Sequence, residues 1–95
     1  MNTQQAQVTT AQASRYLQQL CKHFAHKIPV EYDDRRGRAD FPWGTCHMTA
    51  EDGVLTLRAE APGEDELARV KAVVDDHLTR FAWRETLTVT WGPAA

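Results

Sequence analysis

Apolar residues recur with a helical period over two stretches of the chain. The first stretch runs from about Ala11 to about Lys27, and its stripe holds Ala13, Tyr16, Leu17, Leu20, Cys21, Phe24 and Ile28. The second stretch runs from Glu64 to Phe81, and its stripe holds Leu67, Val70, Val74, Leu78 and Phe81. Residues three or four positions apart lie on the same side of a helix, so both stretches predict amphipathic helices with one apolar face.

Strict alternation of apolar and polar residues predicts strands elsewhere. Three short runs fit this pattern: Gln4–Thr9, Val30–Asp33 and Arg84–Trp91. Between the second run and the hairpin described next, Asp34–Arg38 is typical of a charged turn with Gly37 as its hinge, and Asp40–Gly44 of an aromatic loop. A tail, Gly92–Ala95, follows the last strand.

Asp52-Gly53 is the strongest local signal, because it is a two-residue hairpin turn between two further alternating runs. Counting outward from the turn places Ala50 opposite Leu55, Met48 opposite Leu57 and Cys46 opposite Ala59, all on one side. A slip of one residue would bury His47 and Arg58, so the apolar pattern specifies the register.

The order strand, helix, three strands, helix, strand predicts an α+β fold in one domain, residues 1–95. Two helices on one face of a mostly antiparallel sheet of about five strands, a two-layer sandwich, bury every apolar face at once. The outer sheet face would then carry Gln5, Gln7, Thr9, Thr45, His47, Thr49, Thr56, Arg58, Thr86, Thr88 and Thr90. Such a face is either solvated or covered by a ligand or a second copy of the chain.

The composition narrows the classes of partner. A formal net charge of -2 gives no basic surface for nucleic acid and no polybasic patch for a membrane. The apolar runs are far shorter than a membrane span, and the first residues lack the features of a signal peptide, so we expect a cytoplasmic protein. The two cysteines are then reduced thiols, and both Cys21 and Cys46 point inward, where packing is their ordinary role.

Three histidines could carry chemistry. His23 and His26, three residues apart on the first helix, could share a metal ion with a third ligand, or could be half-exposed side chains near a helix C-terminus. Cys21 cannot join them, because it lies roughly 160° around the helix from His23. His77 should be largely covered on the second helix, where it either bonds a backbone carbonyl or serves as a proton carrier or ligand.

The aromatic loop is a second candidate. Phe41 to Trp43 follows Arg35, Arg36 and Arg38, and this pairing of aromatic area with cations could bind an anionic or planar ligand. The alternative is a loop that closes the end of the sheet. No motif for nucleophilic, phosphate-binding or metalloprotease chemistry occurs in the sequence, which favours a non-catalytic protein.

Three blocks of sequence resemble an uncharacterised bacterial family, domain of unknown function 2218. They are ASRYLxQLCKHFAHK from Ala13 to Lys27, GxxxFxxGxC from Gly37 to Cys46, and HLxRFAWRE from His77 to Glu85. The resemblance implies a two-layer domain with a TATA-binding-protein-like arrangement. Related domains occur attached to siderophore-interacting flavoproteins, so the resemblance also implies a link to iron. It supplies no catalytic residue.

The residues of these blocks that the core does not need are the better site candidates. Together with the aromatic loop, they give a predicted ligand-binding set of Arg15, Lys22, His23, His26, Arg38, Trp43, His77 and Arg84. The first hypothesis is a small accessory domain that binds a ferric chelate or a flavoprotein reductase, without a cofactor of its own. The second is a metal- or haem-binding protein that uses His23 and His26, or His77. The third is an oligomerisation module, a homodimer formed through the outer sheet face.

Overall fold

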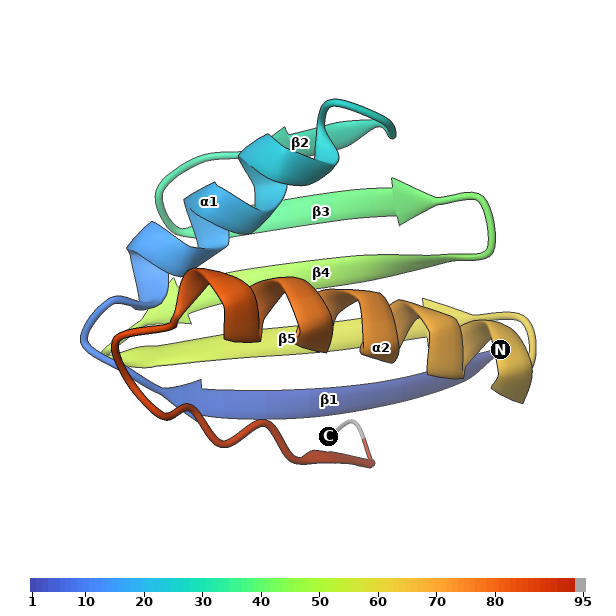
Figure 1. Cartoon of the computed structure of the whole chain (residues 1–95). Helices are drawn as coiled ribbons and strands as arrows, with labels where there is room; N and C mark the ends of the chain where they lie inside the picture. Colours follow the sequence, from blue (N-terminus) through green and yellow to red (C-terminus); the bar gives the residue numbers. More distant parts are fainter. Residues whose placement is uncertain (94–95) are drawn as a thin grey trace.

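Two helices cover one face of an antiparallel sheet (Figure 1). The structure is a computed structural model that describes residues 1–93. These residues form, in order, β1 (Asn2–Thr9), α1 (Ala13–Phe24), β2 (Val30–Tyr32), β3 (Arg36–Phe41), β4 (Gly44–Glu51), β5 (Val54–Ala61), α2 (Glu64–Phe81) and β6 (Trp91–Pro93). The strand order is β2-β3-β4-β5-β1-β6, with antiparallel neighbours throughout. The predicted α+β two-layer class is confirmed, with six strands in the described chain where about five were expected.

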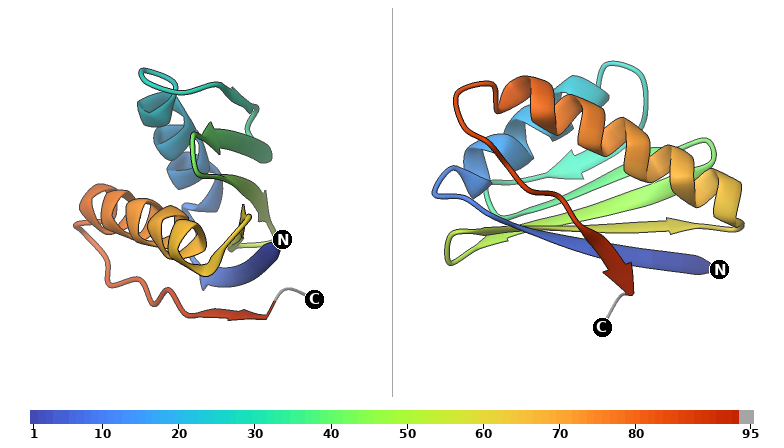
Figure 2. Two further views of the ribbon diagram at one scale, coloured as in Figure 1. Left: turned by 90° about the vertical axis from the view of Figure 1, so that its right-hand side faces the viewer. Right: turned by 60° about the horizontal axis from the view of Figure 1, so that its bottom comes forward.

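The core lies between the helices and the sheet, as the apolar stripes predicted. On α1 the buried residues are Ala13, Tyr16, Leu17, Leu20, Cys21 and Phe24, and on α2 they are Leu67, Val70, Val74 and Leu78. Both helices lie on the same side of the sheet, and the opposite face carries no helix of residues 1–93 (Figure 2). The ends differ slightly from the sequence prediction: α1 ends at Phe24, and the residues up to Lys27 form turns instead.

The hairpin register is the predicted one. Ala50 pairs with Leu55, Met48 with Leu57 and Cys46 with Ala59. At the turn, Asp52 has φ 51° and Gly53 has φ 72°. Two successive positive φ angles are those of a type I′ turn, whose twist matches that of the strands it joins.

The segment after β2 corrects the sequence prediction. The residues expected to form a charged turn and an aromatic loop form most of β3, which pairs with both β2 and β4. Gly37 and Ala39 of β3 are buried, whereas Arg36 and Arg38 point to solvent. The sequence pattern did not show this alternation because Gly37 has no side chain and Ala39 is the one apolar residue among Arg36, Arg38 and Asp40. The turn before the strand is held by Asp33, whose Oδ1 accepts hydrogen bonds from the backbone N–H groups of Arg35 and Arg36, both at 2.8 Å.

The last predicted strand is also corrected. Of Arg84–Trp91, only Trp91 is in a strand, and β6 pairs with β1 so that Ala6 faces Trp91 and Gln4 faces Pro93. Leu87 and Val89 do pack against the core as predicted. The threonines that alternate with them, Thr86, Thr88 and Thr90, lie in an irregular segment, so they are not part of the outer sheet face. Residues 94–95 of the predicted tail lie outside the described residues.

Two smaller findings complete the fold. Tyr32 of β2 is 44% exposed at the edge of the sheet, although the alternation within Val30–Asp33 places it on the apolar side with Val30. Within residues 1–93, neither helix is both long enough and apolar enough to cross a membrane.

Candidate functional site

A groove of about 590 Å³ opens on the helical side of the molecule. It lies between the end of α1, the turn that joins β3 to β4, and the middle of α2. These three elements lie on the helical side of the sheet in Figure 1. The lining residues are His23, Phe24, His26, Lys27, Ile28, Phe41, Pro42, Trp43, Val73 and His77. Three elements that are distant in sequence therefore build one concave surface.

Aromatic rings form the wall of the groove on the sheet side. Phe41 and Trp43 stack with ring centres 4.9 Å apart and planes 11° from parallel. Phe24 meets Phe41 edge to face at 5.1 Å, and it meets His77 in the same way at 5.1 Å. Each of these contacts has the geometry that aromatic pairs prefer, so the wall is held by its own packing. The guanidinium of Arg69 lies 5.3 Å from the centre of the Trp43 ring, within cation–π range.

Two imidazoles meet where the helices approach each other. The rings of His23 on α1 and His77 on α2 have centres 4.7 Å apart and planes tilted by 44°. His77 Nδ1 lies 2.7 Å from the carbonyl oxygen of Val73. A carbonyl can only accept, so this nitrogen carries the proton and donates. The predicted backbone hydrogen bond of His77 is therefore present, although the side chain is only half-buried.

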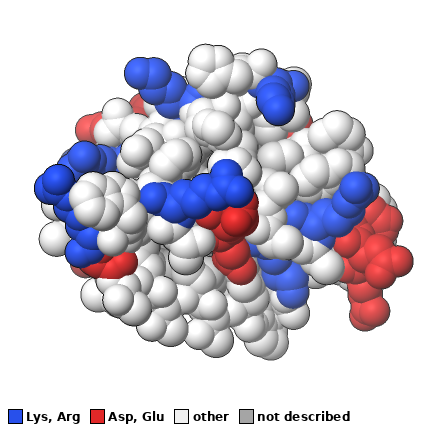
Figure 3. Space-filling view, in the orientation of Figure 1, with Lys and Arg blue, Asp and Glu red and all other residues white. Residues whose placement is uncertain are grey.

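The electrostatic surroundings favour a neutral His23. Partial burial lowers the pKa of His23 below its ordinary value, and the neighbouring His77, His26, Lys27 and Arg80 lower it further. None of the residues of 1–93 that line the groove is an Asp or a Glu. Carboxylates gather elsewhere, for example in the first turn of α2 with Glu64, Asp65 and Glu66, the red patch at the right of Figure 3. The groove is thus apolar on its wall and basic at its mouth.

Half of the predicted ligand-binding residues line the groove. His23, His26, Trp43 and His77 all line it. The other four residues of the set lie elsewhere, so the structure does not bring the eight residues together. Arg15 lies beside a shallow depression near the start of α1, Lys22 is exposed on α1, and Arg84 lies over the ring of Trp83, 4.6 Å from its centre.

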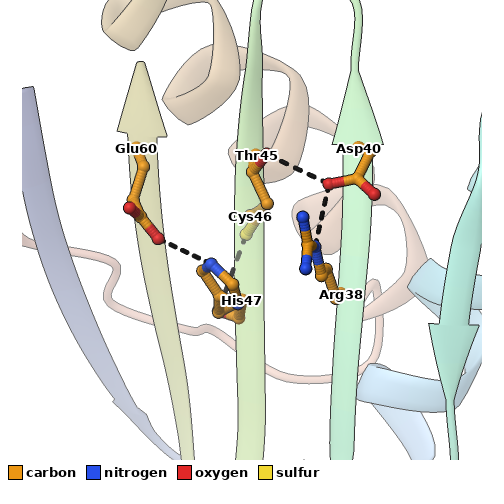
Figure 4. A network of polar contacts seen from close by, with 6 residues as sticks. All are labelled: Arg38, Asp40, Thr45, Cys46, His47 and Glu60. Atoms are coloured by element: carbon orange, nitrogen blue, oxygen red, sulfur yellow. Dashed lines mark hydrogen bonds and ion pairs between the residues drawn. The ribbon is translucent and has the colours of Figure 1, made fainter. Parts of the chain in front are cut away.

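Arg38 belongs to a separate polar network on the outer sheet face (Figure 4). Its Nε donates to Asp40 Oδ1 at 3.0 Å, and Thr45 Oγ1 donates to the same oxygen at 3.1 Å. On the neighbouring strands, His47 Nε2 lies 2.6 Å from Glu60 Oε1. These side chains satisfy one another, and they are separated from the groove by the sheet.

The two histidines predicted to share a metal ion lie in the groove, but they do not pack against each other. His23 and His26 both line the groove, but the imidazole against which His23 packs is that of His77, on the other helix. Within residues 1–93, no three His, Cys, Asp or Glu side chains gather closely enough to hold a metal ion. A site that uses His23 and His26 stays a prediction.

The two thiols are buried on the interior side, as predicted. Cys21 Sγ contacts Met48 Sδ at 3.8 Å, and burial raises the pKa of Cys21 to about 11. Burial also raises the pKa of Cys46, and the adjacent Cys21 adds to that effect. A thiolate is the reactive form of cysteine, so neither side chain is poised for chemistry at neutral pH.

Sequence reasoning missed some residues of the groove. The apolar stripe of the first helix places Phe24 and Ile28 in the core, and Val73 is not part of the stripe of the second helix, yet all three line the groove. Arg69 lies on the polar side of the α2 pattern, and nothing local predicts that it reaches Trp43. Such contacts depend on how far α2 lies from the β3–β4 turn.

Comparison with known proteins supports the fold and leaves the activity open. No curated protein matches the chain. Among solved structures, the chain is similar to the one described as the NMR structure of PA4090 from Pseudomonas aeruginosa, with 39% sequence identity and a TM-score of 0.83. That similarity covers 99% of this chain and 98% of the other. The model of the family described as an uncharacterized protein conserved in bacteria (DUF2218) matches residues 5–92, so this chain belongs to that family.

Proposed function

We propose that this protein is a non-catalytic binding domain whose groove takes a small, negatively charged ligand that presents flat aromatic rings. The observation that carries the proposal is the composition of the groove: stacked aromatic rings on the wall, imidazoles and Lys27 at the mouth, and no carboxylate among its described lining residues. Ligand sites are typically concave and mostly apolar, with a few polar groups that orient the ligand.

The aromatic wall supports a planar ligand. Trp43 is half-buried, with Phe41 stacked against one face. A flat aromatic ligand can pack against such a wall by stacking or by edge contact, at about 0.5–1.5 kcal/mol for each aromatic pair beyond the area it buries. The 590 Å³ of the groove falls in the range of about 300–1,000 Å³ that is usual for small-molecule sites.

The basic mouth supports an anionic ligand. Lys27 and His26 follow the end of α1 and line the groove, and the guanidinium of Arg69 lies 5.3 Å from the centre of the Trp43 ring. An anion placed among these groups gains favourable electrostatic interactions without meeting a like charge from the lining residues. The pairing of charge and aromatic area is the one expected from the sequence, although its cations are Lys27 and Arg69 and not Arg35, Arg36 and Arg38.

As the ligand we propose a ferric chelate with aromatic arms, such as a catecholate complex. Such a chelate combines flat rings with negative charge. The resemblance of the sequence to domains found with siderophore-interacting flavoproteins supports the choice of iron. Reduction of the bound iron would then be the work of a flavoprotein partner.

The test is a titration of the ¹⁵N-labelled protein with ferric 2,3-dihydroxybenzoate, followed through its amide NMR signals. Iron-free 2,3-dihydroxybenzoate and a ferric hydroxamate serve as comparison ligands. We expect the amide signals around the groove to broaden, because ferric iron in a catecholate complex is paramagnetic, and we expect the tightest binding for the ferric catecholate. Equal binding of the iron-free compound would overturn the link to iron, and binding of the hydroxamate alone would overturn the aromatic contact.

Two variants sharpen this test. Trp43→Ala should weaken binding about tenfold, which corresponds to the loss of roughly 1.4 kcal/mol of stacking. Lys27→Glu reverses one charge at an exposed position and should weaken binding of the anion without affecting folding. Trp83→Ala is the matched control, because Trp83 is 74% exposed and does not line the groove. Unchanged affinity in both groove variants would overturn the proposal.

A further inference from the structure

The imidazoles of His23 and His77 form a contact that neither helix could make alone. They are 54 positions apart in sequence (77 − 23), yet their ring centres are 4.7 Å apart across the helix interface. The rings are tilted by 44° and are therefore not stacked face to face. His23 also packs edge to face against Phe81 of α2, at 5.7 Å, so the pair sits at a defined place between the helices.

The separation of the rings suits two ligands of one metal ion. An imidazole nitrogen lies about 2.0–2.1 Å from a bound Zn²⁺, which places the ring centre roughly 3.2 Å from the ion. Two ring centres at that distance and 4.7 Å apart subtend about 95° at the ion. This angle lies between the roughly 90° of neighbouring square-planar ligands and the roughly 109° of tetrahedral ones.

The tautomer of His77 also suits a metal ligand. Nδ1 donates to the Val73 carbonyl, so the neutral ring keeps its lone pair on Nε2. A hydrogen bond from one ring nitrogen to a backbone carbonyl is the arrangement that fixes the tautomer and orientation of metal-binding histidines. His23 is exposed, so its side chain has room to turn a ring nitrogen toward the same point.

The surroundings select the kind of ion. Calcium and magnesium require oxygen ligands, and the described lining of the groove offers no carboxylate. Imidazole suits Zn²⁺, Cu²⁺ and Ni²⁺. The positive charges of Lys27 and Arg80 are close enough to lower the pKa of His23. They would also repel a bound dication, so an anion in its remaining coordination positions would offset that repulsion.

We propose that His23 and His77 bind one divalent transition-metal ion of the zinc, copper and nickel class, with its remaining coordination positions open toward the groove. The site goes beyond the proposed function: it shares the groove, but it requires no aromatic ligand. It also differs from the pair of His23 and His26 that the sequence indicates, because its ligands come from two helices.

The experiment is a titration with Zn²⁺ alone, followed by NMR of the histidine ring nitrogens. We expect one ion per chain, with large ¹⁵N shifts at His77 Nε2 and at one ring nitrogen of His23. The rings of His26 and His47 should keep their positions. Loss of even a hydrogen-bond partner of a metal ligand weakens metal binding about 10- to 100-fold, so His23→Ala and His77→Ala should each weaken it at least about tenfold.

His26→Ala is the matched control, because His26 lies at the same end of α1 and lines the same groove. Because His23 is exposed, His23→Ala should fold normally. The test therefore remains decisive even if His77→Ala fails to fold. The proposal is overturned if Zn²⁺ does not bind, if the shifts fall on His26 or on the thiols, or if His23→Ala binds as tightly as the wild type. The titration contains no chelate, so a negative result leaves the proposed function standing, and failure of the chelate to bind leaves this site standing.

Discussion

Gly37 shows how a single residue sets the distance between the layers. It lies buried in β3 beneath α1, where an added Cβ would be 2.6 Å from Cys21 Sγ and 3.4 Å from Leu17 Cδ2. Real Cβ atoms do not come within 2.6 Å of a sulfur atom, so a side chain at this position would push the helix away from the sheet. The glycine expected to be the hinge of a turn is therefore required for close packing.

Gly37→Ala should lower the free energy of unfolding by about 1–3 kcal/mol, the usual cost of overpacking a core. Urea denaturation measures this change. Gly92→Ala is the matched control, because an added Cβ there meets nothing within 4 Å, and it should change stability little. In the double variant with Cys21→Ala, the loss should be smaller than the sum of the two single losses. Strict additivity would contradict the contact.

His23 provides a second prediction at this scale. Burial is the largest cause of its lowered pKa, and the neighbouring His77 is the second largest. Removing that imidazole in His77→Gln should therefore raise the pKa of His23 part of the way toward 6.5. In the wild type the unfolded chain then binds more protons than the native one, and stability should fall as the pH drops below about 6.5. NMR titration of the His23 ring measures the change in its pKa. Urea denaturation between pH 5 and pH 7 measures the loss of stability, because histidine ordinarily titrates in that interval. A pKa of His23 that does not move in His77→Gln would contradict the contact.

At the scale of elements, the irregular segment between α2 and β6 is tied back to the start of α1. Glu85 accepts hydrogen bonds from the hydroxyl groups of Tyr16, at 2.6 Å, and Thr10, at 3.0 Å. Farther along, Trp91 Nε1 donates to the carboxylate of Asp75 on α2, at 3.0 Å to one oxygen. These contacts explain why the segment can follow the surface without the backbone pairing of a strand.

Glu85→Ala and Tyr16→Phe should be coupled. A hydrogen bond to a charged group contributes roughly 1.5–3 kcal/mol, so each single variant should lower stability by about that amount or less, since Glu85 is exposed. The double variant should lose less than the sum, which a double-mutant cycle measures. Glu51→Ala is the control, because Glu51 is an exposed glutamate at the end of β4. Independent effects would mean that the hydrogen bond does not hold the segment.

At the scale of the whole molecule, the two-layer arrangement buries ionisable groups at its centre. Burial raises the pKa of Cys21 from 9.0 to about 11, and it also raises those of Cys46 and Tyr16. Above pH 9 the unfolded chain loses these protons while the native protein keeps them. The native state then binds more protons, so the free energy of unfolding must fall as the pH rises.

We therefore expect stability to be constant between about pH 7 and 8.5 and to fall above about pH 9, by up to roughly 1.4 kcal/mol per pH unit for each buried thiol. Urea denaturation over this range measures the slope. Cys21→Ala should be less stable at neutral pH but should show a shallower slope at alkaline pH. A slope that Cys21→Ala leaves unchanged would assign the effect to other groups.

The sequence by itself determined the parts of this protein that depend on local periodicity. The two helix stripes, the hairpin turn and its register follow from side chains that repeat every three to four or every two residues. These patterns also placed Cys21 and Cys46 inside and His23 and His26 at the surface, as the structure has them.

Only the tertiary structure decided the rest. Gly37 has no side chain and Ala39 lies between Arg38 and Asp40, so β3 became visible only through its pairing with β2 and β4. The groove depends on how α1, α2 and the β3–β4 turn approach one another, and the contacts of His23 with His77 and of Arg69 with Trp43 follow from that approach. Sequence spacing fixes neighbours along one element, whereas distances between elements are set by the packing of the whole core.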